Sequence, residues 1–192
     1  LVIVLDASSS MAENFNGVEK FVAGHNFLAN FNQAIPDLPL KTALRSFGHS
    51  SAFSDKSTVL NYGLTDYSRS GIAKALASII PAGGPSPMEK SLEAVADDLK
   101  GSEGTIAMVL VSDGKDMDKA PLMAAKELKA RDGDRLCIYT VLVGYDGGGR
   151  AMLASPSQGT GCGKARDAMD NTMGAAVADL VATVMRCNGE VA

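Results

Sequence analysis

Short apolar runs alternate along this chain with segments in which apolar residues recur every three or four positions. The runs at residues 1–5, 42–48, 58–64, 105–111 and 136–143 have the length of β-strands, and the intervening segments predict amphipathic helices. The run at 105–111 is apolar throughout, which indicates a central strand buried on both faces. This alternation predicts an α/β fold. The expected helices cover residues 16–32, 72–80, 88–99, 118–130, 149–155 and 173–184, and a weak edge strand is expected near 162–166.

The order of these elements predicts one doubly wound, mostly parallel six-stranded sheet with helices on both faces. Residues 49–57 between the second and third strands are too few for a crossover helix, so the third strand is expected to be antiparallel. A length of 192 residues predicts a single domain over residues 1–192. Because the chain starts inside a strand and has no initiator Met, we expect it to be a piece of a longer protein.

The charge and hydropathy of the chain indicate which kinds of partner are not expected. The net charge is −4, from 18 basic and 22 acidic side chains, and no basic run occurs. Binding to nucleic acid or to an anionic membrane needs a basic patch, so neither is expected. The longest apolar runs are strand-sized and far shorter than a membrane span, so we expect no transmembrane segment in this chain.

Oxygen-bearing side chains follow the ends of two predicted strands. Asp6, Ser8 and Ser10 alternate directly after the run at 1–5, and Asp113 follows the central strand. Ser86 lies in a Gly/Pro-rich loop before a predicted helix. Ligand sites of open α/β sheets form at the carboxyl ends of the strands. Hydroxyl and carboxylate oxygens suit Mg²⁺, Mn²⁺ or Ca²⁺ better than Zn²⁺ or copper, so a hard divalent cation is predicted here.

The three segments D-x-S-x-S, Ser86-Pro87 and Ser112-Asp113-Gly114 together resemble the von Willebrand factor A domain, also called the integrin I-type domain. This resemblance covers nearly the whole chain and implies a Rossmann-like sheet with strand order 3-2-1-4-5-6. It also implies a metal-ion-dependent adhesion site (MIDAS), in which two hydroxyls bind the ion directly and one coordination position stays open for a partner carboxylate. Ser86 departs from the family, which has Thr at this position. The implied metal ligands are Asp6, Ser8, Ser10, Ser86 and Asp113.

Each piece of this constellation also has a purely structural interpretation. Asp6, Ser8 and Ser10 could cap the following helix, since Asp and Ser are favoured N-caps. Ser86 could open a capping box, and Asp113 before a glycine could form a turn. The joint occurrence of the three segments at the ends of predicted strands favours the metal site over these alternatives.

The resemblance implies a metal-dependent protein-binding module that engages an Asp or Glu side chain of its protein ligand, and not an enzyme. No Ser–His pairing is indicated, because His25 lies on a helix stripe and His49 lies in a loop that we expect to be solvated. One alternative is a metal-dependent phosphoryl-transfer enzyme that uses Asp6. A second alternative is a structural domain that serves only the assembly of a larger protein.

The three cysteines allow one disulfide. Cys137 opens a predicted strand, and Cys162 opens the edge strand expected beside it. Parallel neighbours lie about 4.8 Å apart, within the range that a disulfide needs. We therefore predict a Cys137–Cys162 bridge with Cys187 unpaired, and three reduced thiols in a cytosolic protein remain the alternative. This placement resembles that of bacterial envelope proteins that carry such a domain, which implies an extracytoplasmic location in the periplasm or cell envelope.

Overall fold

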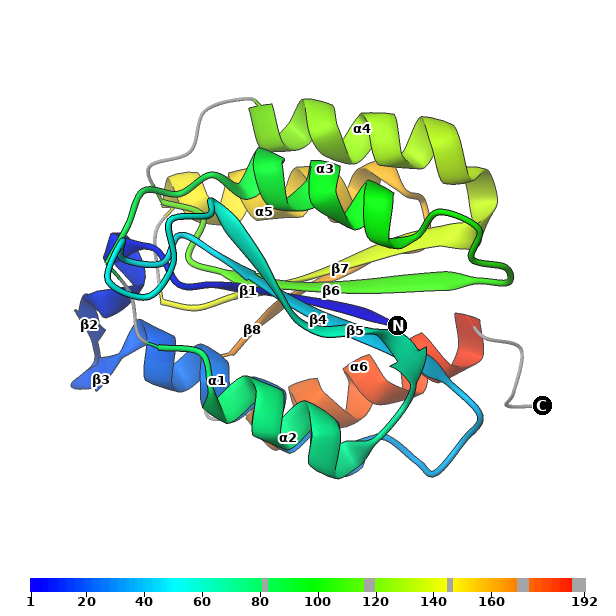
Figure 1. Ribbon diagram of the computed structural model, residues 1–192, viewed down its shortest axis with the longest axis horizontal. Coiled ribbons are helices and arrows are strands. Elements are labelled where there is room, and N and C mark those ends of the chain that lie inside the picture. Colours follow the sequence, from blue (N-terminus) through cyan, green and yellow to red (C-terminus); the bar gives the residue numbers. More distant parts are fainter. Residues whose placement is uncertain (81–82, 116–119, 145–146, 169–172, 188–192) are drawn as a thin grey trace.

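The computed structural model describes residues 1–80, 83–115, 120–144, 147–168 and 173–187. These residues form a six-stranded sheet with the order β5-β4-β1-β6-β7-β8 (Figure 1). All neighbouring pairs are parallel except β4 and β5, which are antiparallel. In chain order the sheet therefore reads 3-2-1-4-5-6 with the third strand antiparallel, which confirms the predicted fold class. The strands are β1 (Val2–Asp6), β4 (Lys41–Phe47), β5 (Thr58–Asp66), β6 (Ile106–Ser112), β7 (Leu136–Leu142) and β8 (Ala165–Asp167).

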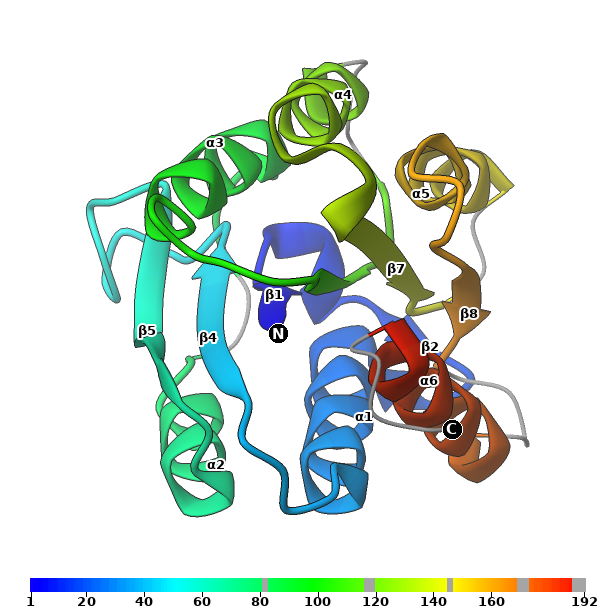
Figure 2. The same ribbon diagram turned by 90° about the vertical axis from the view of Figure 1, so that its right-hand side faces the viewer.

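Helices cover both faces of this sheet, as Figures 1 and 2 show from two directions. One layer contains α1 (Lys20–Ala34), α2 (Arg69–Ala77) and α6 (Met173–Cys187), and the other contains α3 (Met88–Asp98), α4 (Ala120–Asp132) and α5 (Gly147–Gly159). Short 3₁₀ turns lie at Ser9–Ala12 (η1) and Gly133–Arg135 (η2). Among the described residues, no helix combines the length and the hydropathy that crossing a bilayer requires.

The central strands supply side chains to two separate cores. Because side chains alternate between the faces of a strand, Ile3 and Leu5 of β1 pack under α1 and α6, whereas Val2 and Val4 pack under α3. Every residue of β1, β6 and β7 is buried. The continuous apolar runs of the sequence thus correspond to strands covered on both sides.

Helix α1 begins four residues later than the sequence pattern predicts. The predicted start at residue 16 is wrong because Asn16 and Gly17 both have positive φ, at 51° and 81°. Asn-Gly in this conformation forms a tight turn, which here joins the two-residue strands β2 (Asn14–Phe15) and β3 (Val18–Glu19). This small hairpin makes Lys20 the first residue of α1.

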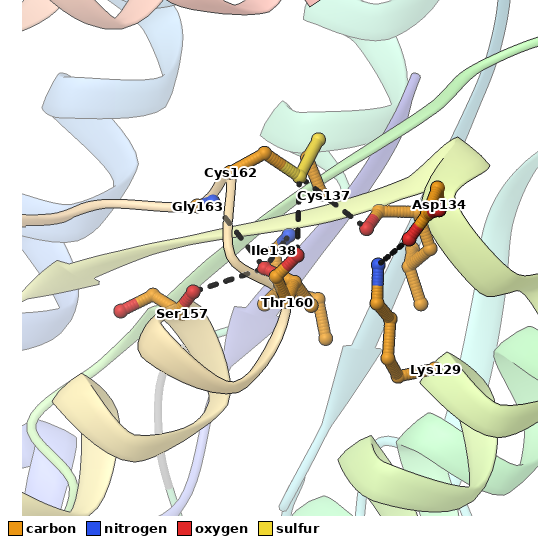
Figure 3. Close-up of a disulfide and its surroundings, with 9 residues drawn as sticks. Lys129, Asp134, Cys137, Ile138, Ser157, Thr160, Cys162 and Gly163 are labelled. Atoms are coloured by element: carbon orange, nitrogen blue, oxygen red, sulfur yellow. Dashed lines mark hydrogen bonds and ion pairs between the residues drawn. A yellow bond between two sulfur atoms is a disulfide. The ribbon is translucent and has the colours of Figure 1, made fainter.

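A disulfide joins Cys137 at the start of β7 to Cys162, with 5.4 Å between the two Cα atoms (Figure 3). The predicted pairing is present, but the predicted location of Cys162 is wrong. The edge strand β8 begins only at Ala165, where it pairs with Thr140, so Cys162 lies in the turn before it. The backbone at Gly163 runs so close to β7 that a Cβ there would lie 1.8 Å from the carbonyl oxygen of Ile138. The side chain of Cys187 is outside the part of the structure that is described.

Candidate metal site

The carboxyl ends of β1 and β6 bring together four of the five predicted ligands. Leu5 pairs with Val111 in parallel register, so Asp6 is level with Ser112, and Asp113 follows at the same edge of the sheet. Oδ1 of Asp6 accepts a hydrogen bond of 2.8 Å from the Ser8 amide. The Ser8 and Ser10 hydroxyls lie 3.3 Å apart, and Ser10 Oγ donates to Asp113 Oδ1 at 3.1 Å. All four predicted ligands are buried.

Helix capping does not account for these side chains. Ser8 is the N-cap residue of η1, yet its side chain makes no capping hydrogen bond. The Ser8 hydroxyl instead faces that of Ser10, which in turn donates to the Asp113 carboxylate. The alternation of Asp, Ser and Ser therefore directs three oxygen-bearing groups to one place.

Asp6 is a buried carboxylate, and burial raises its pKa to about 6. Hydrogen bonds from Ser112 and Ser8 act in the opposite direction, and Ser112 Oγ donates to Asp6 Oδ2 at 2.6 Å. Within the described residues Asp6 has hydrogen bonds but no ion pair. The sequence analysis did not identify Ser112 as a site residue, although it lies in the S-D-G segment itself.

Ser86 lies on a loop that is fixed to the D-x-S-x-S segment by its backbone. Gly84 O accepts a hydrogen bond of 2.8 Å from the Ser9 amide, and the Gly83 amide donates to Ala7 O at 3.2 Å. Helix α3 has Pro87 as its N-cap and no side-chain capping bond, so Ser86 does not form the capping box that its sequence allows. In the described structure no hydrogen bond joins the half-buried Ser86 hydroxyl to the other four candidates.

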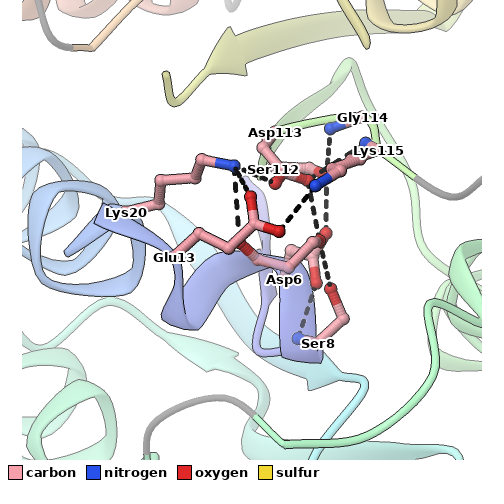
Figure 4. Close-up of polar contacts among 9 residues, drawn as sticks. Asp6, Ser8, Glu13, Lys20, Ser112, Asp113, Gly114 and Lys115 are labelled. Carbon is pink, nitrogen blue, oxygen red and sulfur yellow. Dashed lines mark hydrogen bonds and ion pairs between the residues drawn. The ribbon is translucent and has the colours of Figure 1, made fainter. Parts of the chain in front are cut away.

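A lysine that sequence reasoning did not identify also belongs to this cluster. Lys20 Nζ lies 2.9 Å from Asp113 Oδ2 and 2.9 Å from Glu13 Oε2, and it donates to the Ser10 carbonyl oxygen at 3.4 Å. Glu13 also pairs with Lys115 at 2.5 Å, which places a second lysine at the rim (Figure 4). Burial alone would lower the pKa of Lys20, but hydrogen bonds to Asp113 and Glu13 outweigh it, and the pKa is raised.

His49 is buried, not solvated as expected. Its Nε2 lies 2.6 Å from Ser46 Oγ, and its Nδ1 has no hydrogen-bond partner in the described structure. Burial lowers the pKa of His49. Ser46 also accepts a hydrogen bond of 2.6 Å from Asn61, and its side chain has no exposed surface. The Ser46–His49 pair is therefore enclosed, and the Ser46 hydroxyl has no access to solvent in this structure.

The chemistry of the cluster fits a hard divalent cation. The described residues contain no group of three or more His, Cys, Asp or Glu side chains that could hold a metal. The site instead combines two carboxylates, Asp6 and Asp113, with neutral hydroxyls, and only Asp113 has a counter-charge. Oxygen donors of this kind are the ligands that Mg²⁺, Mn²⁺ and Ca²⁺ prefer.

Comparison with solved structures gives similar folds at low sequence identity. An aerotolerance-related membrane protein from Bacteroides fragilis, carrying multiple mutations to serine, has a TM-score of 0.74 and 17% identity, with 98% of each chain covered. The vWF domain of the type V pili tip protein Mfa5 from Porphyromonas gingivalis has a TM-score of 0.64 and 13% identity, with 100% of this chain and 97% of that chain covered. Proximal thread matrix protein 1 from the mussel byssus, with a zinc-occupied MIDAS motif, has a TM-score of 0.65 and 20% identity, with 94% of this chain and 45% of that longer chain covered.

Sequence comparisons give the family. A search of curated proteins found no match. The family model for the von Willebrand factor type A domain matches residues 1–151, which is most of the chain. That match contains β1, β6 and the whole candidate metal site. The chain belongs to the von Willebrand factor type A domain family.

Proposed function

We propose that this chain binds a divalent cation, Mg²⁺ before Mn²⁺ or Ca²⁺, through Asp6, Ser8, Ser10, Ser86 and Asp113, and uses that ion to bind a protein that presents an Asp or Glu side chain. The observation that carries this proposal is the convergence of two buried carboxylates and two hydroxyls at the carboxyl edge of the sheet. Asp6 lies there without a cationic partner, and burying an uncompensated carboxylate is costly. A bound cation would supply the missing charge.

The donor set also suggests why the ion would accept a partner. Ser8 and Ser10 are neutral ligands, so they leave more of the ion's charge uncompensated than carboxylates in their place would. A carboxylate from another protein can complete the coordination and the charge together. This role is binding and not catalysis, and the buried Ser46–His49 pair offers no alternative nucleophile.

The structural relatives support this function and a location outside the cytoplasm. One relative is solved with zinc in its MIDAS motif, a second is a bacterial membrane protein, and a third belongs to a pilus tip. The Cys137–Cys162 disulfide is also typical of an oxidising compartment. We propose that the chain works as an adhesion or scaffolding module in a bacterial periplasm or cell envelope.

The metal assignment is tested by calorimetric titration of the chain with Mg²⁺ and Mn²⁺, together with thermal unfolding. At a free ion concentration 100 times the dissociation constant, the free energy of unfolding should rise by about 2.7 kcal/mol. Asp6→Ala should abolish this gain. Ser9→Ala is the matched control, because Ser9 lies in the same segment but is exposed. An equal metal response in Asp6→Ala and the unmodified chain would contradict the assignment.

The partner chemistry is tested with an array of peptides in which each Asp or Glu is matched by Asn or Gln. Binding is expected only to the acidic members and only with Mg²⁺ or Mn²⁺ present. The Ser8→Ala/Ser10→Ala variant should lose this binding while its circular dichroism stays native, and Ser9→Ala should retain it. Binding to the array that survives chelation of the metal would instead favour a structural assembly domain.

A further inference from the structure

The Lys20 ammonium group is built into the proposed metal site. Its side chain is only 8% exposed and contacts the Asp113 carboxylate, the Glu13 carboxylate and the Ser10 carbonyl oxygen. A lysine is rarely buried unless it is paired, and this one is held from three sides. The turn at Asn16-Gly17 makes it the first residue of α1 and brings it to this edge of the sheet.

The position of Lys20 changes the charge that a metal ion would meet. Asp6 and Asp113 carry two negative charges and Lys20 one positive charge, so the inner cluster has a net charge of −1 when both carboxylates are ionised. Glu13 also contacts Lys20, but its negative charge is balanced by a second lysine, Lys115, so this added pair leaves the net charge unchanged. A divalent ion would therefore raise the inner cluster to +1, whereas without the lysine the same ion would only neutralise it.

We propose that Lys20 tunes this metal site: it holds the Asp113 carboxylate in place, lowers the affinity for a divalent cation, and leaves a bound cation with excess charge for an acidic partner. The inference rests on the proposed function, since it concerns the same ion. Lys20 acts here as a positioning residue through Asp113. It follows that the ion and an acidic partner should bind cooperatively, each raising the affinity for the other.

Coulomb's law gives the expected size of the effect. A unit charge and a divalent charge about 6 Å apart repel strongly enough, even at the dielectric constant of water, to change a binding constant about tenfold. The cluster is buried, where the effective dielectric constant is lower and the repulsion stronger, while loss of the contact that holds Asp113 acts in the opposite direction. Replacing the lysine by a neutral side chain of similar length should therefore tighten metal binding about tenfold.

The experiment is a Mn²⁺ titration in which electron paramagnetic resonance counts the free ion, with no partner present. Lys20→Met is expected to bind Mn²⁺ about tenfold more tightly than the unmodified chain. Lys20→Arg keeps the charge, so its Mn²⁺ affinity should stay closer to that of the unmodified chain than to that of Lys20→Met. Lys41→Met is the control for net charge, because Lys41 is exposed and lies at the opposite end of β4 from the site.

The outcomes separate this inference from the proposed function. If the unmodified chain and Asp6→Ala bind Mn²⁺ equally, the metal site itself is wrong. If binding depends on Asp6 but Lys20→Met has the same or a lower affinity, only the role of Lys20 is overturned. If Lys20→Met is unfolded without metal, Mn²⁺ is expected to refold it. If circular dichroism shows that the variant stays unfolded with Mn²⁺, the proposed role of Lys20 is also overturned.

Discussion

Reduction of the Cys137–Cys162 disulfide should destabilise the fold. The expected loss of unfolding free energy depends on the length of the loop that the disulfide closes. The bond links residues separated by 25 positions. In the chain-entropy model, opening a loop of this length costs about 3.5 kcal/mol at 25 °C. For a protein of this size each kcal/mol shifts the melting temperature by about 2–4 °C, so the expected fall is about 7–14 °C. The bridge also ties down the three-residue edge strand β8, which should become accessible first after reduction.

The measurement is urea unfolding followed by circular dichroism, with and without a phosphine reductant. The unmodified chain should lose about 3.5 kcal/mol on reduction. Cys137→Ala/Cys162→Ala should not respond to the reductant, while Cys187→Ala should respond like the unmodified chain. A loss below about 1 kcal/mol would refute the entropic reasoning. Three free thiols, counted in denaturant without reductant, would refute the bridge itself.

Two further substitutions test the packing around the site. Gly149→Ala would place a Cβ 2.0 Å from the carbonyl oxygen of Asp113 and should cost about 1–3 kcal/mol in unfolding experiments, whereas Gly147→Ala in the same helix meets nothing within 4 Å and should be close to neutral. The lowered pKa of His49 means that its stabilising contribution is full above its ordinary value of 6.5 and is lost as the pH falls through the folded-state pKa. The unfolding free energy of the unmodified chain minus that of His49→Gln should therefore fall as the pH is lowered from 7 to 5. A difference that stays constant over this range would contradict the prediction. The raised pKa of Asp6 produces the opposite trend, but it does so in both proteins and cancels in the difference.

Hydrophobic periodicity predicted the fold because apolar residues recur at different spacings in strands and in helices. The side chains at these positions form the two cores. The sheet order came from the family resemblance, and the structure confirms it. The misplaced start of α1 shows where periodicity fails. Val18 lies within the predicted helix but belongs to β3, because the Asn-Gly turn delays the start of α1 to Lys20, and its side chain is exposed. Turn chemistry decided the boundary, since two consecutive residues with positive φ cannot continue a helix.

The same limit applies to the candidate site. Asp6 and Asp113 could be found because each follows a buried strand, and parallel strands end at one edge. Lys20 could not, because its contact with Asp113 joins residues 93 positions apart and depends on where the helix begins. His49 was misjudged because a loop position suggests solvent, whereas its ring packs against Phe53 and its Nε2 contacts Ser46. Sequence motifs predict the ligands of such a site. Tertiary packing determines which further charged groups, such as Lys20, lie beside those ligands.

The metal site and the disulfide should stabilise the chain independently, because they lie at opposite ends of the sheet. Cys137 pairs with Ala107 near the start of β6, whereas Asp113 follows its end. Six residues of strand separate the two levels, about 20 Å at 3.3 Å per residue. Contributions from sites this far apart add within about 0.5 kcal/mol. Unfolding free energies measured with and without Mn²⁺, each with and without reductant, form a cycle that tests this. A coupling above about 1 kcal/mol would show that the disulfide reaches the metal site through the sheet, and that the oxidation state of the chain regulates metal binding.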